Sequence, residues 1–465
     1  MLNEEWNDII RKHAGMSESQ FVQAELEAFL YSKKRQEILQ ARNYYQGKHK
    51  LPEHVVMDSN GNPTDAKGTI PNNKIINNLF DDLVDQKTNY LLSKPIDVKS
   101  SIDLTDFFNK NFQRTLKNLG KDAYIGTIAY LHPYIDNQGN FKLKRMKPEF
   151  VIPLWHDEEH DSLDAFIYFY EFEVYTTPKT KTSFYKVEYY KPEGVTYYDY
   201  INGSLQPDTT KGSRPYIQSS GLSYNWQSVP LVWFRSNSEE VPLLSKIKPL
   251  QDALNQMLSN FANVMSQDVH NTILVIKGYD GENLANFREQ LARYGAIKIT
   301  SSPEFESGVE TLNIEVNASN YETIIKLLER AIITNGRGFD AKDDRMANNP
   351  NQMNINSMYS DIDLDANEME TEFQASLERL LTFINAYLSL SNKSTSNDTV
   401  FIFNRDLPLN QSELIDACRN STGIISEETI VANHPWTLDT KEELERIKKE
   451  RNEVLNNDVL GTTFS

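Results

Sequence analysis

The spacing of apolar residues divides the first half of the chain into a helical part and a β part. Apolar side chains recur every three to four positions over 17–41, after Pro71 and over about 104–120, which predicts three helices. Over 123–234, β-branched and aromatic residues alternate with polar ones, and turn signals such as Asn202-Gly203 interrupt the alternation. This pattern predicts an antiparallel β region of roughly a hundred residues, which is a normal domain size.

The second half of the chain predicts two helical struts that hold a small module at one end and a loop at the other. A long helix over about 249–270 has one apolar face, and its opposite face is polar but almost uncharged. Short strand and helix patterns follow over 271–318, and a second helix returns over 319–334. The polar stretch 341–356 shows little periodicity and is expected to be a mobile loop. A helix over 357–390 then begins with acidic residues and ends with apolar ones.

Composition indicates a folded protein that does not grip nucleic acid. The chain has 465 residues, enough for roughly two to four domains, and 11% of them are aromatic. Its formal net charge is -18, and tight phosphate binding needs a basic face, so we expect the chain at most to surround DNA without holding it. The single cysteine, Cys418, excludes an intrachain disulfide and a multi-thiolate metal site. We expect neither a signal peptide nor a membrane span, because the apolar runs are too short.

One short pattern supplies the alternative interpretation, a metal-dependent hydrolase. His156, Glu159 and His160 have the H-x-x-E-H spacing of a class of zinc peptidases. That chemistry needs both imidazoles on one helical face, with the glutamate beside a metal-bound water. Here the stretch lies between two strand patterns, so we expect a turn and no metal.

A second pattern has the spacing of a calcium-binding loop. Acidic or amide residues occupy the first, third, fifth and seventh positions from Asp361, and Glu372 is the twelfth. The sixth position is Ala366 rather than glycine, and the flanking sequence continues as one helix, so we expect an acidic helix start instead. Whether Asp361, Asp363 and Asp365 bind a cation, face DNA or face a neighbouring subunit stays open at this point. Since no phosphate-binding glycine loop occurs, we expect neither enzyme activity nor a cofactor.

Several short segments, taken in order, carry a resemblance to a known family. They are YYQG at 44–47, NNKIINN at 72–78, VDQKTNYL at 84–91 with Pro95, LQDALN at 250–255, GIISEET at 423–429, His434-Pro435 and EELERI at 442–447. Through them the chain resembles, over nearly its whole length, the portal proteins of tailed double-stranded-DNA bacteriophages. The resemblance is specifically to those of siphophages that infect Gram-positive bacteria.

The resemblance implies an α+β portal fold, which forms a ring and has a wing, a helical stem, a small α/β clip and a short α-helical crown. Carried onto this sequence, the parts are the wing at 1–241, a stem helix at 242–270, the clip at 271–318, the returning stem helix at 319–335, the tunnel loop at 336–356, the long wing helix with its linker at 357–397, and the crown at 398–465.

The resemblance also implies roles for particular residues. In the tunnel loop, the residues expected to meet DNA are Lys342, Asp343, Asp344, Arg345, Asn348, Asn349, Asn351 and Gln352. On the polar face of the first stem helix, the residues expected to line the channel are Gln251, Asn255, Ser259, Asn263, Gln267 and His270. In the clip, those expected to dock partners are Tyr279, Glu282, Phe287, Arg288 and Arg293.

The implied partners are those of a DNA conduit. They are other copies of the chain in a ring, usually twelve, double-stranded DNA that passes through without sequence preference, the terminase large subunit, a head–tail adaptor, and the major capsid and scaffolding proteins. The protein is then a virion component at the portal vertex, assembled in the host cytoplasm with no membrane. The net charge of -18 suits this role, because acidic and amide walls let a polyanion slide. Another head–tail connector is a weaker alternative, since such chains are usually much shorter.

Overall fold

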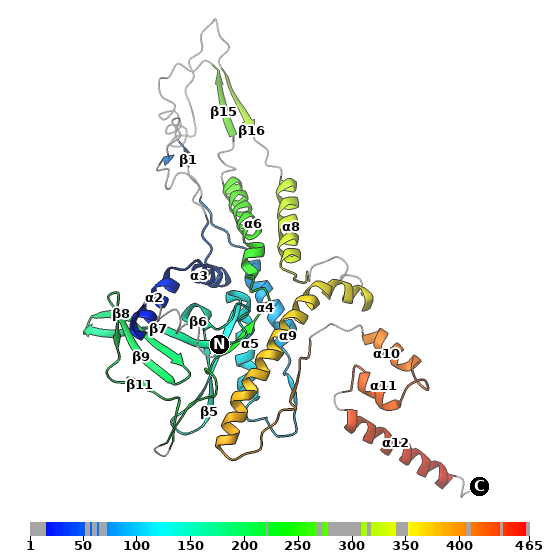
Figure 1. The fold of residues 1–465 in the computed structure, drawn as a ribbon. Helices are drawn as coiled ribbons and strands as arrows, with labels where there is room; N and C mark the ends of the chain where they lie inside the picture. The colour runs from blue at the N-terminus through cyan, green and yellow to red at the C-terminus, as the bar shows by residue number, and fades with distance from the viewer. Residues whose placement is uncertain are drawn as a thin grey trace. The chain divides into compact units, whose positions relative to one another are not determined.

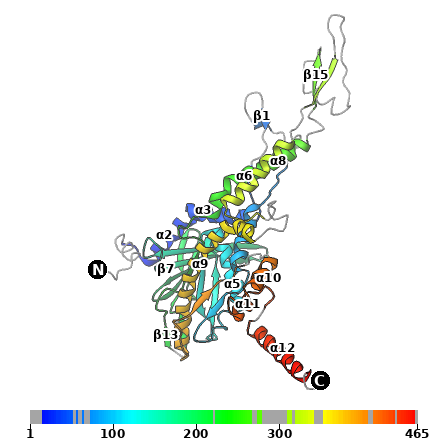
Figure 2. The ribbon, with the colours of Figure 1, turned by 90° about the vertical axis from the view of Figure 1, so that its right-hand side faces the viewer.

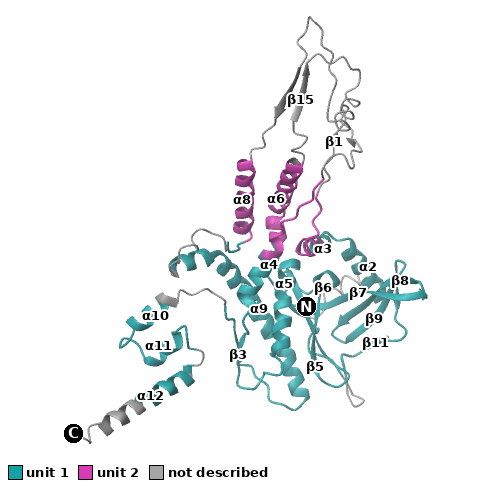
Figure 3. Ribbon diagram, turned by 180° about the vertical axis from the view of Figure 1, so that it is seen from behind, with its two compact units in different colours: residues 1–39, 83–243, 337–465 teal, residues 40–82, 244–336 magenta. Residues whose placement is uncertain are grey.

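The structure is a computed structural model that mixes helices with mainly antiparallel sheets, in agreement with the predicted α+β class. It describes residues 15–51, 56–57, 63–64, 72–219, 222–266, 272–277, 308–313, 318–340, 352–405, 411–437 and 440–461. The chain divides into two compact units (Figure 3). Unit 1 holds residues 1–39, 83–243 and 337–465, and unit 2 holds residues 40–82 and 244–336.

The main sheet of unit 1 is antiparallel and built from consecutive hairpins (Figure 1). Its strands are β6 (Val151–Trp155), β7 (Leu163–Thr177), β8 (Thr180–Lys191), β9 (Gly194–Ile201) and β10 (Ser204–Pro207), in the order β10-β9-β8-β7-β6, with β11 (Ser213–Arg214) also paired to β9. Asn202 and Gly203 connect β9 to β10 with φ values of 50° and 79°. Positive φ at both central residues is what a type I′ hairpin turn requires, so the predicted hairpin turn is confirmed.

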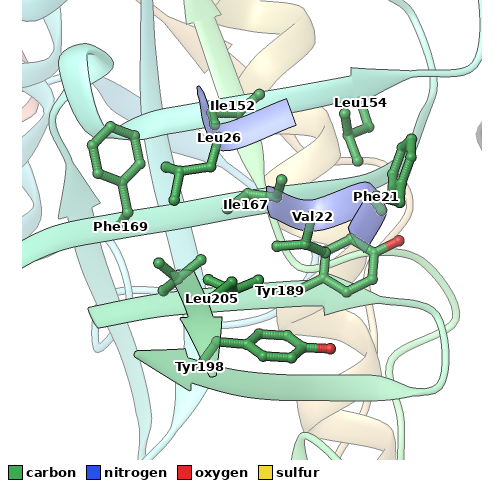
Figure 4. Close-up of a cluster of buried hydrophobic side chains, with 12 residues drawn as sticks. Phe21, Val22, Leu26, Ile152, Leu154, Ile167, Phe169, Tyr189, Tyr198 and Leu205 are labelled. Atoms are coloured by element: carbon green, nitrogen blue, oxygen red, sulfur yellow. The ribbon is translucent and has the colours of Figure 1, made fainter. Parts of the chain in front are cut away.

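Helix α2 (Glu18–Tyr31) covers one face of this sheet (Figure 4). Ser17 caps the helix in a reciprocal capping box with Gln20, which fixes where the helix begins. The buried side chains that meet here come from α2 and five strands, and they are Phe21, Val22, Leu26, Ile152, Leu154, Ala165, Ile167, Phe169, Val187, Tyr189, Tyr198 and Leu205. The alternation of each strand therefore supplies a continuous apolar face for the helix.

A second, three-stranded sheet covers the opposite face, with β4 (Ile128–Ile135) between β14 (Val232–Arg235) and β5 (Phe141–Met146). Residues of both sheets share one buried cluster, to which Tyr130 and Trp233 contribute from the smaller sheet. Helix α5 (Lys110–Gly126) precedes β4, and the long helix α9 (Gln352–Leu390) packs against β14. The Phe373 and Phe234 rings lie 5.0 Å apart, and the Arg379 guanidinium lies 3.5 Å from the centre of the Trp233 ring.

Shorter elements complete unit 1. They are β3 (Asp97–Lys99) paired with β17 (Val400–Ile402), the 3-10 turn Pro148–Phe150, β12 (Ile217–Ser219) paired with β13 (Leu222–Tyr224), and the helices α10 (Gln411–Asn420), α11 (Glu427–Asn433) and α12 (Thr440–Gly461). None of the helices that the structure describes is both long enough and apolar enough to cross a membrane.

Unit 2 is built around two helices that lie side by side, α6 (Leu243–Ser266) and α8 (Ala318–Asn335) (Figures 1 and 2). Their contact includes the rings of Phe261 and Tyr321, 5.1 Å apart. The unit also holds the antiparallel pairs β15 (Thr272–Lys277) with β16 (Gly308–Asn313) and β1 (Val56–Met57) with β2 (Pro63–Thr64). The chain passes from one unit to the other within α3 (Lys33–Tyr45), within α4 (Leu79–Leu92), after the first residue of α6, and after Gly336.

The predicted helix boundaries are wrong at several places. Residues 17–41 are not one helix, because Ser32 is extended, closes α2 through Phe29 and accepts a hydrogen bond from Arg35 N at the start of α3. Helix α6 begins at Leu243 rather than at Pro249, since burial of Leu244 and Ile247 outweighs the hydrogen bond that the proline lacks. Residues 72–78 are extended rather than helical, and α4 begins only at Leu79. The third predicted helix lies later, over Lys110–Gly126.

Candidate functional site: the α6 ladder and the α4–α9 junction

The predicted tunnel-loop and clip residues lie mostly outside the described part of the chain. Of the tunnel-loop set, Lys342 to Asn351 fall there, and Gln352 is the first residue of α9. All of the predicted docking residues, from Tyr279 to Arg293, also fall outside it. The structure describes the elements on either side of these segments, namely the β15–β16 pair around 278–307, and residue 340 and α9 around 341–351.

The polar face of α6 binds an extended segment of the same unit. Main-chain N–H groups at every second residue of 73–79 donate to side chains at every fourth residue of α6. The bonds are Asn73 N to Asn263 Oδ1 (2.6 Å), Ile75 N to Ser259 Oγ (3.0 Å), Asn77 N to Asn255 Oδ1 (2.9 Å) and Leu79 N to Gln251 Oε1 (3.0 Å). We call this set of bonds the α6 ladder.

The two spacings of the ladder match because of backbone geometry. Four residues of an α-helix rise about 6 Å, and two residues of an extended chain rise about 6.6 Å. One row of helix side chains can therefore follow one edge of the segment over its whole length. The helix supplies the acceptors that a neighbouring strand supplies in a sheet, so the N–H groups of the segment are satisfied without a β partner.

The ladder corrects the prediction that this face of α6 lines a channel. Gln251 and Asn255 are 0% exposed within the subunit, and Ser259 and Asn263 are also buried. Their oxygens accept hydrogen bonds from the main chain, so these four side chains cannot also face a water-filled tunnel. The remaining two predicted residues, Gln267 and His270, lie outside the described residues.

Further bonds tie the extended segment to its surroundings in unit 2. Gln251 Nε2 donates to the Asn77 carbonyl at 2.7 Å, and Asn77 Nδ2 donates to Glu329 Oε1 on α8 at 2.9 Å. Asn255 Nδ2 lies 2.8 Å from His49 Nδ1, and the His49 ring stacks on Tyr44 at 4.1 Å. The segment is thus bonded to α6 and α8 together.

The buried side chain of Tyr44 makes a further hydrogen bond to α6. Its hydroxyl donates to Asp252 Oδ1 at 2.6 Å, and the other carboxylate oxygen of Asp252 accepts from Lys248 Nζ at 2.6 Å. Burial, together with the neighbouring Asp252 carboxylate, raises the pKa of Tyr44, so the phenol stays protonated and remains a donor at neutral pH. Both Tyr44 and the 72–78 run belong to the segments that carry the family resemblance, and sequence periodicity alone gave no contact between them and α6.

In unit 1, α4 fixes the chain immediately before residue 341. Gln86 on α4 binds Phe339 through both main-chain groups, accepting from Phe339 N at 2.7 Å and donating to Phe339 O at 2.6 Å. The buried Phe339 ring stacks on Tyr359 of α9 at 4.1 Å. The residues on both sides of 341–351 are therefore held against neighbouring helices, and we call this contact the α4–α9 junction.

Acidic residues of α9 extend this junction. Asp365 Oδ2 binds Lys87 Nζ at 2.7 Å and accepts from the Tyr124 hydroxyl at 2.8 Å, and the Lys87 side chain is 0% exposed. Asp363 accepts from the Tyr90 hydroxyl at 2.9 Å and from Arg405, which also binds Glu370 at 2.7 Å. Burial is the largest cause that raises the pKa of both Tyr90 and Tyr124, so both phenols are neutral donors.

These contacts correct the calcium-loop alternative. Residues 361–372 lie inside the continuous helix α9, so they do not wrap around an ion as a calcium loop does. Because α9 begins at Gln352 rather than at residue 357, they are not the predicted acidic helix start either. Asp363 and Asp365 already bind an arginine and a lysine, and Asp361 is exposed on the helix surface. Within the described residues, no group of three or more His, Cys, Asp or Glu side chains is placed to hold a metal ion.

The H-x-x-E-H pattern likewise does not assemble a zinc site. Residues 156–160 form a turn after β6, as predicted, and His160 has a φ of 60°. The two rings have different carboxylate partners, because His156 Nδ1 lies 2.9 Å from Asp164 and His160 Nδ1 lies 2.6 Å from Glu240. The His160 ring also stacks on Trp155 at 4.6 Å. This geometry gives the hydrolase alternative no support.

Comparison with known proteins finds relatives that are named as portal proteins. The profile of the family described as "Phage portal protein, SPP1 Gp6-like" matches residues 31–456. A portal protein of Clostridium phage phiCD119 is 28% identical over 437 residues, which cover 90% of this chain and 94% of the relative. A portal protein of Bacillus phage SPP1 is 27% identical over 387 residues, which cover 80% of this chain and 74% of that protein.

Similarity to solved structures is lower. A chain in the structure titled "Neck of native GTA particle computed with C12 symmetry" has a TM-score of 0.39 and 11% identity. The match covers 76% of this chain and 88% of that chain. At this level the likeness carries no argument about fold or function.

Proposed function

Because the chain belongs to the SPP1 Gp6-like family of phage portal proteins, we propose that it forms the ring at one capsid vertex through which the terminase motor packs DNA and DNA later leaves. The observation that carries this proposal is the family match over residues 31–456. Portal proteins are structural components of the virion, and their family implies ring assembly and DNA passage. The number of subunits, usually twelve in such rings, and docking of terminase and a head–tail adaptor belong to the proposal, as does assembly in the host cytoplasm.

We assign the parts of the portal to elements of the structure as follows. Helices α6 and α8 are the stem, β15, β16 and the residues between them are the clip, residues 341–351 are the tunnel loop, the two sheets with α9 are the wing, and α10 to α12 are the crown. The α6–α8 pair supports the stem assignment, since the two helices pack side by side and bracket the clip in sequence. Residues 72–79, which the resemblance places in the wing, bind the polar face of α6, so we assign them to the stem as well.

This assignment changes which surface of the stem is available to DNA. The amide row of α6 is occupied by residues 73–79, so the channel wall is formed by other surfaces of the helix pair. The exposed residues there are neutral or mixed in charge, such as Gln256 on α6 and the Glu322–Lys326 pair on α8. A wall without a cationic stripe attracts phosphates weakly, so DNA can slide along it.

The two cations of the tunnel loop are expected to touch DNA during packaging. Replacing Lys342 and Arg345 together by alanine should lower the DNA content of heads while purified rings stay intact, because transient phosphate contacts are lost. Packaged DNA is measured by nuclease protection, and rings are counted by electron microscopy. The matched control is Lys448→Ala with Lys449→Ala on the exposed surface of α12, which removes the same charge. Equal DNA content in wild-type and loop-variant heads would refute the loop–DNA contact.

Electron microscopy of the purified protein tests the proposed function itself. It should show rings with a central hole, and a uniform population of monomers would overturn the proposal.

A further inference from the structure

The hairpin of β7 and β8 extends well past the rest of the main sheet (Figures 1 and 3). Strand β6 pairs with β7 only as far as Tyr168, and β9 pairs with β8 only from Tyr185 onward. Beyond these points, β7 and β8 pair with each other alone, from Phe172 opposite Phe184 to Thr177 opposite Thr180. We call residues 171–184 the distal ribbon. Its two outer edges have no neighbouring strand in the described chain.

The distal ribbon is amphipathic. Phe172 pairs with Phe184, and Val174 pairs with Thr182, so by strand alternation these four side chains share one face. The opposite face carries Glu171, Glu173, Tyr175, Lys181 and Ser183. Phe172 and Val174 are 43% and 37% exposed, and the Phe172 and Phe184 rings lie 5.8 Å apart in an edge-to-face contact. This face of the ribbon is therefore mainly apolar and open to solvent in the isolated subunit, and its charged neighbour in these contacts is the Lys186 ammonium, 5.5 Å from the centre of the Phe184 ring.

A two-stranded ribbon with unpaired edges and an exposed apolar face is expected to bind a partner. A two-stranded ribbon is at best marginally stable in water, and it needs a third strand or a packed face. An antiparallel strand whose alternation is apolar on one side normally turns that side toward a core. Open strand edges beside exposed apolar side chains also favour association with another chain.

The charge of the ribbon indicates which partner it fits. Glu171 and Glu173 are balanced by Lys179 and Lys181, whereas the whole chain carries a net charge of -18. Copies of so acidic a chain repel one another wherever acidic surfaces meet, so contacts between copies are best made through neutral apolar patches. A cyclic ring also requires each copy to present two different surfaces to its neighbours.

From these observations we propose that the apolar face of the distal ribbon, formed by Phe172, Val174 and Phe184, docks on the neighbouring copy of this chain in the ring. The partner is a second copy and not another protein of the head. The inference rests on the proposed ring and names one of the surfaces that close it.

The first test removes the apolar face while keeping the β propensity of the strand. In the full-length protein, Phe172→Thr with Val174→Thr should raise the concentration needed for half-maximal ring assembly by about tenfold or more, because two apolar side chains lose their burial. The matched control, Glu173→Thr with Lys181→Thr, changes the other face without changing net charge and should assemble like the wild type. Circular dichroism shows whether both variants are folded. Unchanged assembly of the folded Phe172→Thr, Val174→Thr variant would overturn the inference.

The second test uses the fact that the chain has a single cysteine, Cys418. In a Cys418→Ser background, Val174→Cys and Glu173→Cys place a thiol-linked benzophenone on adjacent residues that face opposite sides of the ribbon. Light should join the Val174→Cys subunits to one another within rings, and the Glu173→Cys label should do so far less. If wild-type rings form but the label at residue 174 joins no second copy, the inference fails and the portal function stands. If the wild-type chain forms no rings, the proposed function fails as well.

Discussion

Replacing Asn255 by leucine should destabilise unit 2 by about 3 kcal/mol, since the change leaves buried polar groups without partners. Asn255 Oδ1 accepts from Asn77 N and from Gln251 Nε2, and its amide nitrogen lies against His49. Leucine has a similar volume but no hydrogen-bonding group, so each of these partners loses its bond, and the Gln251 amide loses it in a fully buried place. The measurement is hydrogen exchange at the Asn77 amide together with denaturant unfolding of the full chain.

The control for this prediction is the next residue of the same helix. Gln256 is exposed, and Gln256→Leu makes the same change of side-chain type one position along. It should alter the free energy of unfolding by no more than about 0.5 kcal/mol and leave exchange at Asn77 unchanged. If the two variants behave alike, the ladder does not hold the extended segment in place.

Replacing Lys87 by methionine should cost unit 1 about 3–5 kcal/mol, because it leaves the Asp365 carboxylate without its buried counter-ion. The Lys87 side chain is 0% exposed, and its ammonium lies 2.7 Å from Asp365. The Tyr124 hydroxyl remains as a donor to that carboxylate, but a neutral donor cannot offset the charge. Thermal unfolding of unit 1, followed by tryptophan fluorescence from Trp233 and its neighbours, measures the loss.

Two further variants separate the buried pair from ion pairs in general. Lys326→Met breaks a pair of the same length with Glu322, but the Lys326 side chain is 72% exposed, so the cost should be only a few tenths of a kcal/mol. Combining Lys87→Met with Asp365→Leu removes both charges and should recover most of the lost stability. If Lys87→Met costs no more than Lys326→Met, the α4–α9 junction does not depend on this pair.

Much of the helical framework could be predicted from sequence because its signal is local. The stripes of apolar residues in α6, α8 and α9 repeat over many turns, and the alternation over 123–234 marks the strands of unit 1. The Asn202-Gly203 turn is fixed by the residues that tolerate positive φ. These features need no knowledge of distant contacts.

The role of the polar face of α6 could not be predicted in the same way. An uncharged row of amides has the same period whether it faces a channel or a main-chain edge, and the residues that decide between the two lie at 73–79, far away in the sequence. The same reason explains the wrong helix over 72–78, since Ile75 and Ile76 fit a helical stripe until the ladder is known. The sequence does contain one signal that could have linked residues 72–78 to α6. It is the run of asparagines over 72–78, together with the uncharged amide side chains on one face of the later helix.

The acidic residues of α9 show a related limit. Their spacing was compatible with a cation, with DNA or with a neighbouring subunit, and the structure instead pairs Asp363 with Arg405 and Asp365 with Lys87. The burial of Lys87 in α4 cannot be predicted from the spacing of apolar residues. A lysine in an amphipathic helix is normally interpreted as part of the solvent-exposed face. The partner of a buried charge is therefore set by tertiary contacts, which the local sequence does not contain.

Single-particle electron microscopy of the purified protein directly tests whether the chain forms a ring through which DNA can pass. We expect closed rings of one rotational symmetry with an open axial hole, in which the α6 ladder residues contact the 73–79 segment rather than the hole. A population made only of monomers, or of compact particles without an axial hole, would contradict it.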